Sequence, residues 1–99
     1  MNLESINRVH FIGIGGLGMS ALAKFFLYTG VEVSGYDRSK TEITLWLSNL
    51  GSHIIYHDDI SLIKDIESVD LVVFTPAISS NNVQLNHFKK TNIPVHKRA

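Results

Sequence analysis

Cysteine is absent from this 99-residue sequence, and its net charge is zero, with 9 Lys and Arg residues against 9 Asp and Glu residues. Without cysteine there can be no disulfide scaffold, thiolate nucleophile or thiolate zinc site. The balanced charge argues against general electrostatic binding to nucleic acid or to an anionic membrane. No apolar run approaches the roughly 18 residues of a membrane span, and residues 1–8 lack the apolar core of a signal peptide. We therefore expect one soluble, cytoplasmic domain without a nucleic-acid or membrane partner.

Several catalytic motifs are missing as well. The sequence contains no G-x-x-x-x-G-K-[ST] phosphate-binding loop, no G-x-S-x-G nucleophile motif and no H-E-x-x-H zinc motif. His57, Asp58 and Asp59 are adjacent, but neighbouring residues of an extended chain point to opposite sides, and no second histidine has a ligand-like spacing. We expect no metal site and no catalytic residue, and so a binding domain.

The most informative stretch is residues 9–20, VHFIGIGGLGMS, in which an apolar run leads into a glycine-rich turn and then into a helical pattern. Gly13, Gly15 and Gly18 fit the G-x-G-x-x-G spacing. In this pattern the first glycine permits a sharp turn, the second lets a ligand approach the backbone, and the third lets the helix lie close to the sheet. The free N–H groups at the start of such a helix suit a phosphate or pyrophosphate.

Strand and helix patterns alternate along the rest of the chain. Strands are expected at residues 8–14, 31–36, 53–56, 69–75 and 93–96. Helices are expected at residues 17–28, 39–50, 60–66 and 82–91, the second starting with a Ser39–Glu42 capping box and the third capped by Asp59. Right-handed crossovers then predict an α/β fold, a Rossmann-like three-layer open parallel sheet of five strands in the order 3-2-1-4-5. Pro94 suits an edge strand.

Two positions around the glycine turn have specific predictions. Asp37 ends the second strand 19 residues after Gly18, where an acidic residue accepts hydrogen bonds from ribose hydroxyls. Residues 75–81 should lie beside the glycine turn, because the fourth strand is expected next to the first. His10 interrupts the first strand and is expected to be a buried, neutral histidine with a local hydrogen-bond partner. On these features alone, an NAD-binding domain of an oxidoreductase or redox sensor is the alternative to a UDP-sugar-binding domain.

The wording of residues 10–21, HFIGIGGLGMSA, closely resembles the N-terminal signature of the Mur ligases of peptidoglycan synthesis, in particular of those that add L-alanine to UDP-N-acetylmuramate. Residues 33–37, 50–51, 76–78 and 93–99 resemble further segments of the same domain. The resemblance implies that residues 1–99 are a UDP-N-acetylmuramate-binding domain, inactive alone. ATP and Mg²⁺ would bind outside it in a cytoplasmic, ADP-forming ligase that serves cell-wall synthesis, cell shape and division.

The resemblance also implies a set of site residues. The residues carried over for UDP-N-acetylmuramate are Gly15, Gly16, Leu17, Gly18, Met19, Ser20, Asp37, Arg38, His57, Thr75, Pro76, Ala77, Ile78 and Ser79. Two positions depart from the family pattern. The family histidine near the uracil aligns with Asp58, one place after His57, and either residue could face the base. Where the family usually has serine in the fourth-strand loop, this chain has Thr75 or Pro76.

Overall fold

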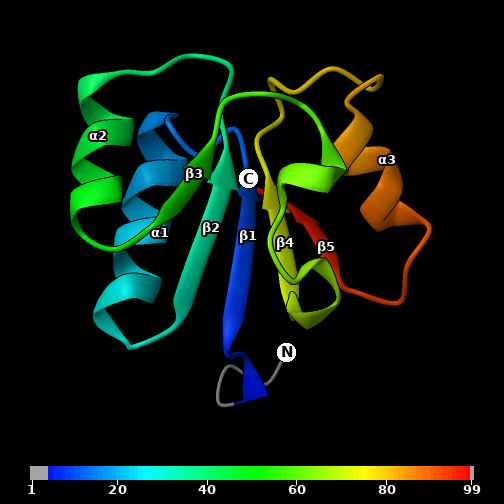
Figure 1. Ribbon diagram of the computed structural model, residues 1–99, viewed down its shortest axis with the longest axis horizontal. Helices are drawn as coiled ribbons and strands as arrows, with labels where there is room; N and C mark the ends of the chain where they lie inside the picture. Colours follow the sequence, from blue (N-terminus) through cyan, green and yellow to red (C-terminus); the bar gives the residue numbers. More distant parts are fainter. Residues whose placement is uncertain (1–4, 99) are drawn as a thin grey trace.

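The computed structural model describes residues 5–98 and shows one parallel sheet with helices on both faces (Figure 1). The strands are β1 (Arg8–Ile12), β2 (Glu32–Tyr36), β3 (His53–Ile55), β4 (Leu71–Phe74) and β5 (Val95–Lys97). Their order is β3-β2-β1-β4-β5, and every neighbouring pair is parallel. The predicted fold class and strand order are therefore confirmed, and β5, which follows Pro94, is an edge strand.

The helices are α1 (Leu17–Tyr28), α2 (Glu42–Asn49) and α3 (Val83–Lys89), with two 3₁₀ turns, η2 (Ile60–Leu62) and η3 (Ile66–Ser68). The bounds predicted for the first helix are confirmed. The predicted third helix is wrong: Asp59 does cap Ser61, but the chain leaves the helical conformation at Ile63, and only two short turns form.

The cap of α2 also differs from the prediction. The Thr41 hydroxyl accepts a hydrogen bond from the Thr44 N–H (3.2 Å), and the Thr44 hydroxyl accepts one from the Thr41 N–H (2.8 Å). This reciprocal pair replaces the expected Ser39–Glu42 box. A threonine at the third helical position can serve in place of Glu, because its hydroxyl reaches back to the same N–H group.

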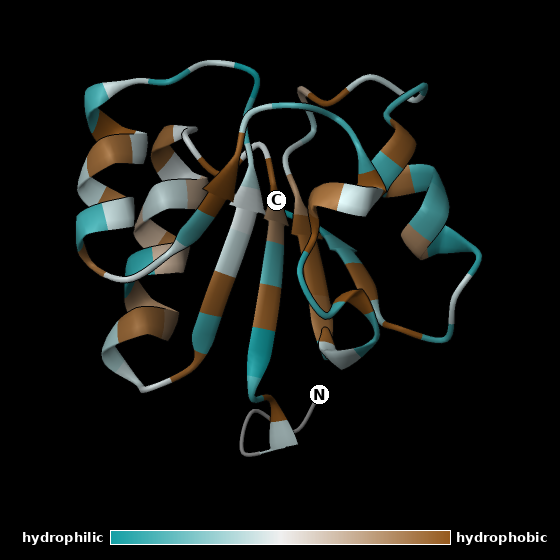
Figure 2. Cartoon of the chain, viewed as in Figure 1, coloured by the Kyte–Doolittle hydropathy of each residue, from teal (hydrophilic) through white to brown (hydrophobic). Residues whose placement is uncertain are grey.

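Successive side chains of β1 and β4 point to opposite faces of the sheet and so belong to two different apolar cores. Val9 and Phe11 of β1 belong to the core under α1 and α2, whereas Ile12 and Val72 belong to the core under α3. In Figure 2, β4 is brown along most of its length, as expected of a strand that is covered on both faces. None of the helices within residues 5–98 is long and apolar enough to cross a membrane.

A hydrogen-bonded group of buried polar side chains lies around His10. His10 is 1% exposed, and its Nδ1 and Nε2 atoms each lie 2.8 Å from a partner, Ser34 Oγ and Gln84 Oε1 respectively. Burial lowers the pKa of His10 to about 4, so the imidazole is neutral. The predicted buried, neutral histidine is confirmed, but the prediction of a local partner is wrong. Ser34 lies in β2 and Gln84 in α3, so the imidazole links the central strand to a neighbouring strand and to that helix.

Candidate functional site

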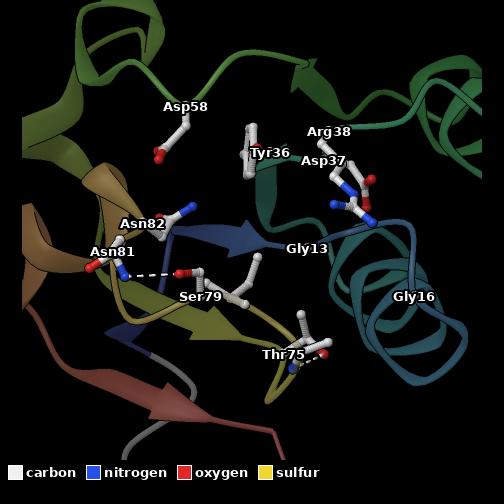
Figure 3. Close-up of a pocket in the computed structure, with 12 residues that line it drawn as sticks. Gly13, Gly16, Tyr36, Asp37, Arg38, Asp58, Thr75, Ser79, Asn81 and Asn82 are labelled. Carbon is white, nitrogen blue, oxygen red and sulfur yellow. Dashed lines mark hydrogen bonds between the residues drawn. The ribbon is translucent and has the colours of Figure 1, made fainter.

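A cavity of about 510 Å³ opens beyond the carboxyl ends of β1, β2 and β4 (Figure 3). It is lined by Gly13, Gly16, Tyr36, Asp37, Arg38, Asp58, Thr75, Ala77, Ile78, Ser79, Asn81 and Asn82. The chain order of the sheet reverses between β1 and β4, and ligands of open α/β sheets bind at this position. The volume is in the range of small-molecule sites.

The glycine turn forms one wall of the cavity. Gly13 has φ of +89°, and the Tyr36 carbonyl accepts hydrogen bonds from the Gly13 and Ile14 N–H groups (2.8 and 3.0 Å). A Cβ atom at Gly13 would collide with the Thr75 side chain. The turn is thus fixed to the end of β2 and lies against the loop after β4, as the sequence predicted.

The start of α1 at this wall has unpaired N–H groups. Gly16 is the N-cap residue and supplies no side-chain cap, and the first turn contains no acidic residue. Within residues 5–98, the N–H groups of Leu17, Gly18 and Met19 donate no hydrogen bond to another residue. Unpaired N–H groups and the positive end of a helix dipole together attract an anion.

Asp37 holds the glycine turn in place. Its Oδ2 accepts a hydrogen bond from the Gly15 N–H (2.8 Å), and its Oδ1 accepts one from the Ser39 N–H (3.0 Å). A Cβ atom at Gly15 would lie 2.8 Å from Asp37 Oδ2, so the missing side chain makes room for this carboxylate, and the approach of a ligand to Gly15 stays a prediction. Asp37 also lines the cavity, and its contact with a ribose stays a prediction.

The third glycine of the motif lies against an arginine side chain. A Cβ atom at Gly18 would collide with the guanidinium group of Arg98. The backbone N–H of Arg98 donates a hydrogen bond to the Phe74 carbonyl (2.9 Å), so this arginine lies where the sheet ends, and the close packing of α1 on the sheet at Gly18 stays a prediction. A positive charge lies beside the start of α1.

The opposite wall of the cavity comes from the start of α3 and the segment after β3. Asp58 caps α3, because its two carboxylate oxygens accept hydrogen bonds from the Val83 N–H (2.6 Å) and the Gln84 N–H (3.0 Å). Tyr36 lies between the two walls. Its pKa is raised first by burial and then by the negative charges of Asp58 and Asp37, so the phenol keeps its proton.

The structure brings half of the predicted site residues together at the cavity. Those that line it are Gly16, Asp37, Arg38, Thr75, Ala77, Ile78 and Ser79. Those that do not are Gly15, Leu17, Gly18, Met19, Ser20, His57 and Pro76. Met19 and Ser20 are buried in α1, whereas His57 is exposed. Of the two residues left open for the base, Asp58 is the one at the cavity.

Four residues that line the cavity are not among the predicted site residues: Gly13, Tyr36, Asn81 and Asn82. The sequence predicts Gly13 only as part of the turn, Asn81 only as part of the loop beside it, and Asn82 only as the start of a helix. Tyr36 could have been predicted from its position, because it is the last residue of β2 and ligands bind at the carboxyl ends of the strands in this fold. Within residues 5–98, no group of three or more His, Asp or Glu residues could hold a metal ion.

Comparisons with known proteins agree with this geometry. Residues 8–99 match the family model described as "Mur ligase family, catalytic domain". The chain is 45% identical to the UDP-N-acetylmuramate–L-alanine ligase of Flavobacterium johnsoniae over 101 residues, which cover all of this chain and 22% of the relative. It is 43% identical to the enzyme of the same name from Clostridium tetani over 98% of this chain and 21% of the relative. The chain thus spans about a fifth of the length of these curated relatives.

Solved structures give the same result. The UDP-N-acetylmuramate–alanine ligase of Thermotoga maritima superposes with a TM-score of 0.82 at 34% identity, over 92% of this chain and 20% of that one. SirC, a precorrin-2 dehydrogenase, superposes over all of this chain and 47% of its own with a TM-score of 0.60 at 19% identity, which shows a common fold alone. With a family model that matches nearly its whole length and relatives above 40% identity, this chain belongs to the Mur ligase family.

Proposed function

We propose that residues 1–99 are the N-terminal domain that binds UDP-N-acetylmuramate in a ligase that joins L-alanine to this sugar nucleotide. The names of the relatives support the choice of substrate. The observation that carries the proposal is the start of α1, where three N–H groups, which find no acceptor among residues 5–98, lie next to a cavity of nucleotide size. A diphosphate satisfies those N–H groups and the helix dipole together.

The cavity has two ends that suit the two ends of such a ligand. The glycine turn and the exposed side chain of Arg38 offer N–H groups and positive charge for the diphosphate. The Thr75 hydroxyl and the loop up to Ser79 line the cavity next to the glycine turn, and the opposite side is formed by Asp58 and the start of α3. Asp37, whose oxygens already accept backbone hydrogen bonds, keeps free lone pairs for ribose hydroxyls.

The chemistry of ligation would take place elsewhere in the full-length enzyme. The sequence has no phosphate-binding loop for ATP, and among the described residues that line the cavity no nucleophile is paired with a general base. ATP, Mg²⁺ and L-alanine would therefore bind to parts of the cytoplasmic, ADP-forming ligase outside these 99 residues. The segment alone binds substrate and catalyses nothing.

An amide NMR titration tests this proposal, with UDP-N-acetylmuramate and NAD in separate samples. UDP-N-acetylmuramate should shift the resonances of residues 15–20, 37–38 and 75–80, and NAD should not. The variant Leu17→Asp places a carboxylate at the first position of α1, where Leu17 is 83% exposed, and should weaken binding about tenfold by competing with the phosphates. Leu45→Asp on the surface of α2 is the matched control. Shifts with NAD alone would identify a dinucleotide-binding domain instead.

A further inference from the structure

Arg98 places a positive charge beside the start of α1. The residue follows the edge strand β5, and its backbone N–H donates a hydrogen bond to the Phe74 carbonyl (2.9 Å). All five parallel strands end at this edge of the sheet, from which α1 also starts (Figure 1). The Arg98 side chain reaches the first turn of α1, where its guanidinium group occupies the space that a Cβ atom of Gly18 would need. It therefore lies next to the N–H groups proposed to bind the diphosphate.

The charge of this guanidinium group is not balanced by any neighbour among residues 5–98. Over this range the Arg98 side chain donates no hydrogen bond and forms no ion pair. The first turn of α1 contains no acidic residue. The start of a helix is itself positive, so the helix dipole repels an arginine at this end and attracts one only at the other end. Two positive groups thus lie side by side, together with three N–H groups that lack acceptors.

An anion at this point would turn the repulsion into two attractions. One phosphate oxygen can accept hydrogen bonds from the N–H groups of the helix, and others can accept from the planar fork of the guanidinium group. Arginine suits this contact better than lysine, because its N–H groups match two phosphate oxygens at once.

We propose that Arg98 binds the diphosphate of the sugar nucleotide together with the start of α1, an inference that rests on the proposed function. Gly18 then has a specific role in binding, because the missing side chain leaves the space in which the guanidinium group lies. The third glycine of the motif and an arginine 80 residues later in the chain form one unit for the recognition of phosphate.

Isothermal titration of UDP-N-acetylmuramate into the 99-residue chain and its variants tests the role of Arg98. Arg98→Met removes the guanidinium group but keeps an unbranched side chain. It should weaken binding about tenfold, as expected for the loss of one charge-assisted hydrogen bond at an exposed residue. Arg98→Lys keeps the charge without the fork and should restore part of the affinity.

Lys97→Met is the matched control, because it removes the same charge at the neighbouring exposed residue. Lys97 pairs in register with Phe74, whose side chain packs against the core under α3, so Lys97 points to the face of the sheet opposite α1. Its substitution should change the affinity by less than about twofold. A loss equal to that of Arg98→Met would show a general charge effect and would overturn the proposal.

Thermal melting without ligand separates a binding role from a structural one. Arg98→Met should melt no lower than the unmodified chain, because it removes a charge that the helix dipole repels. If Arg98 served only to pack against Gly18, its substitution would lower the melting temperature and leave the affinity unchanged. That result would overturn the proposal.

Gly18→Ala tests the space in which the guanidinium group lies. It should displace this group and weaken binding as much as Arg98→Met does, and in the double variant the two losses should not add. Additive losses would show that the new methyl group blocks the ligand itself and would overturn the pairing of Gly18 with Arg98. Unchanged affinity in folded Arg98→Met would overturn the role of Arg98 and leave the proposed function intact. If the unmodified chain does not bind UDP-N-acetylmuramate, both proposals fail.

Discussion

Protonation of His10 should destabilise the fold in mildly acidic solution. The imidazole is fully buried, and Gln84 Oε1 can only accept, so Nε2 carries the proton and Nδ1 accepts from the Ser34 hydroxyl. A second proton would have to enter at Nδ1, which would force the Ser34 hydroxyl to turn and accept, and would leave a charge in a buried site. Burial accordingly lowers the pKa to about 4, compared with an ordinary value of 6.5.

The size of the effect follows from these two values. Because the unfolded chain binds this proton below pH 6.5 and the folded chain does not until about pH 4, the stabilisation is complete above pH 6.5 and decreases as the pH falls. At 1.36 kcal/mol per pH unit, the loss is about 2 kcal/mol by pH 5 and about 3 kcal/mol by pH 4. A loss of 2 kcal/mol is a large fraction of the stability of a domain of this size.

Urea unfolding between pH 7.5 and pH 5 measures this loss. His10→Asn, which does not titrate, should be less stable at neutral pH but should lose about 2 kcal/mol less than the unmodified chain over this interval. His96→Asn removes an exposed histidine and should leave the pH dependence unchanged. If His10→Asn and the unmodified chain show the same pH dependence, the imidazole is not held neutral by burial and the reasoning is refuted.

Three further substitutions test single contacts. Gly13→Ala adds a side chain where the backbone has φ of +89° and where Thr75 leaves no room. It should lower the free energy of unfolding by about 1–3 kcal/mol and the melting temperature by several degrees. An unchanged melting temperature would contradict this. Thr41→Ala removes the side-chain cap of α2 and should lower the free energy of unfolding in urea by about 1 kcal/mol, whereas Thr41→Ser, which keeps the hydroxyl, should lower it little. Equal losses in the two variants would show that the hydroxyl does not stabilise the helix. Asp58→Asn replaces one of the two carboxylate oxygens at the start of α3 by an NH₂ group, so that a donor faces a backbone N–H donor. It should lower the free energy of unfolding by about 1 kcal/mol and speed amide exchange at residues 83–85, and unchanged exchange there would argue against the cap.

The sheet and the glycine turn could be predicted because their signals are local. The apolar run of β1, the periodicity of α1 and the glycine spacing each arise within about a dozen consecutive residues. Right-handed crossovers then leave few possible strand orders, and the predicted order is the one observed. Local alternatives could not be separated in the same way: Thr41 and Ser39 are both good caps, and only the backbone path determines which hydroxyl meets an N–H group.

The sequence by itself determined the fold class, the position of the cavity at the carboxyl edge of the sheet and, within its glycine wall, Gly16. The tertiary structure alone decided the other wall, where Tyr36, Asp58 and Asn82 meet from three separate segments. It also decided that Arg98 covers Gly18 and that Gln84 completes the hydrogen bonding of His10. Periodicity specifies which face of an element is buried, but not which distant side chain lies opposite; that depends on how far each strand and loop extends before the chain turns.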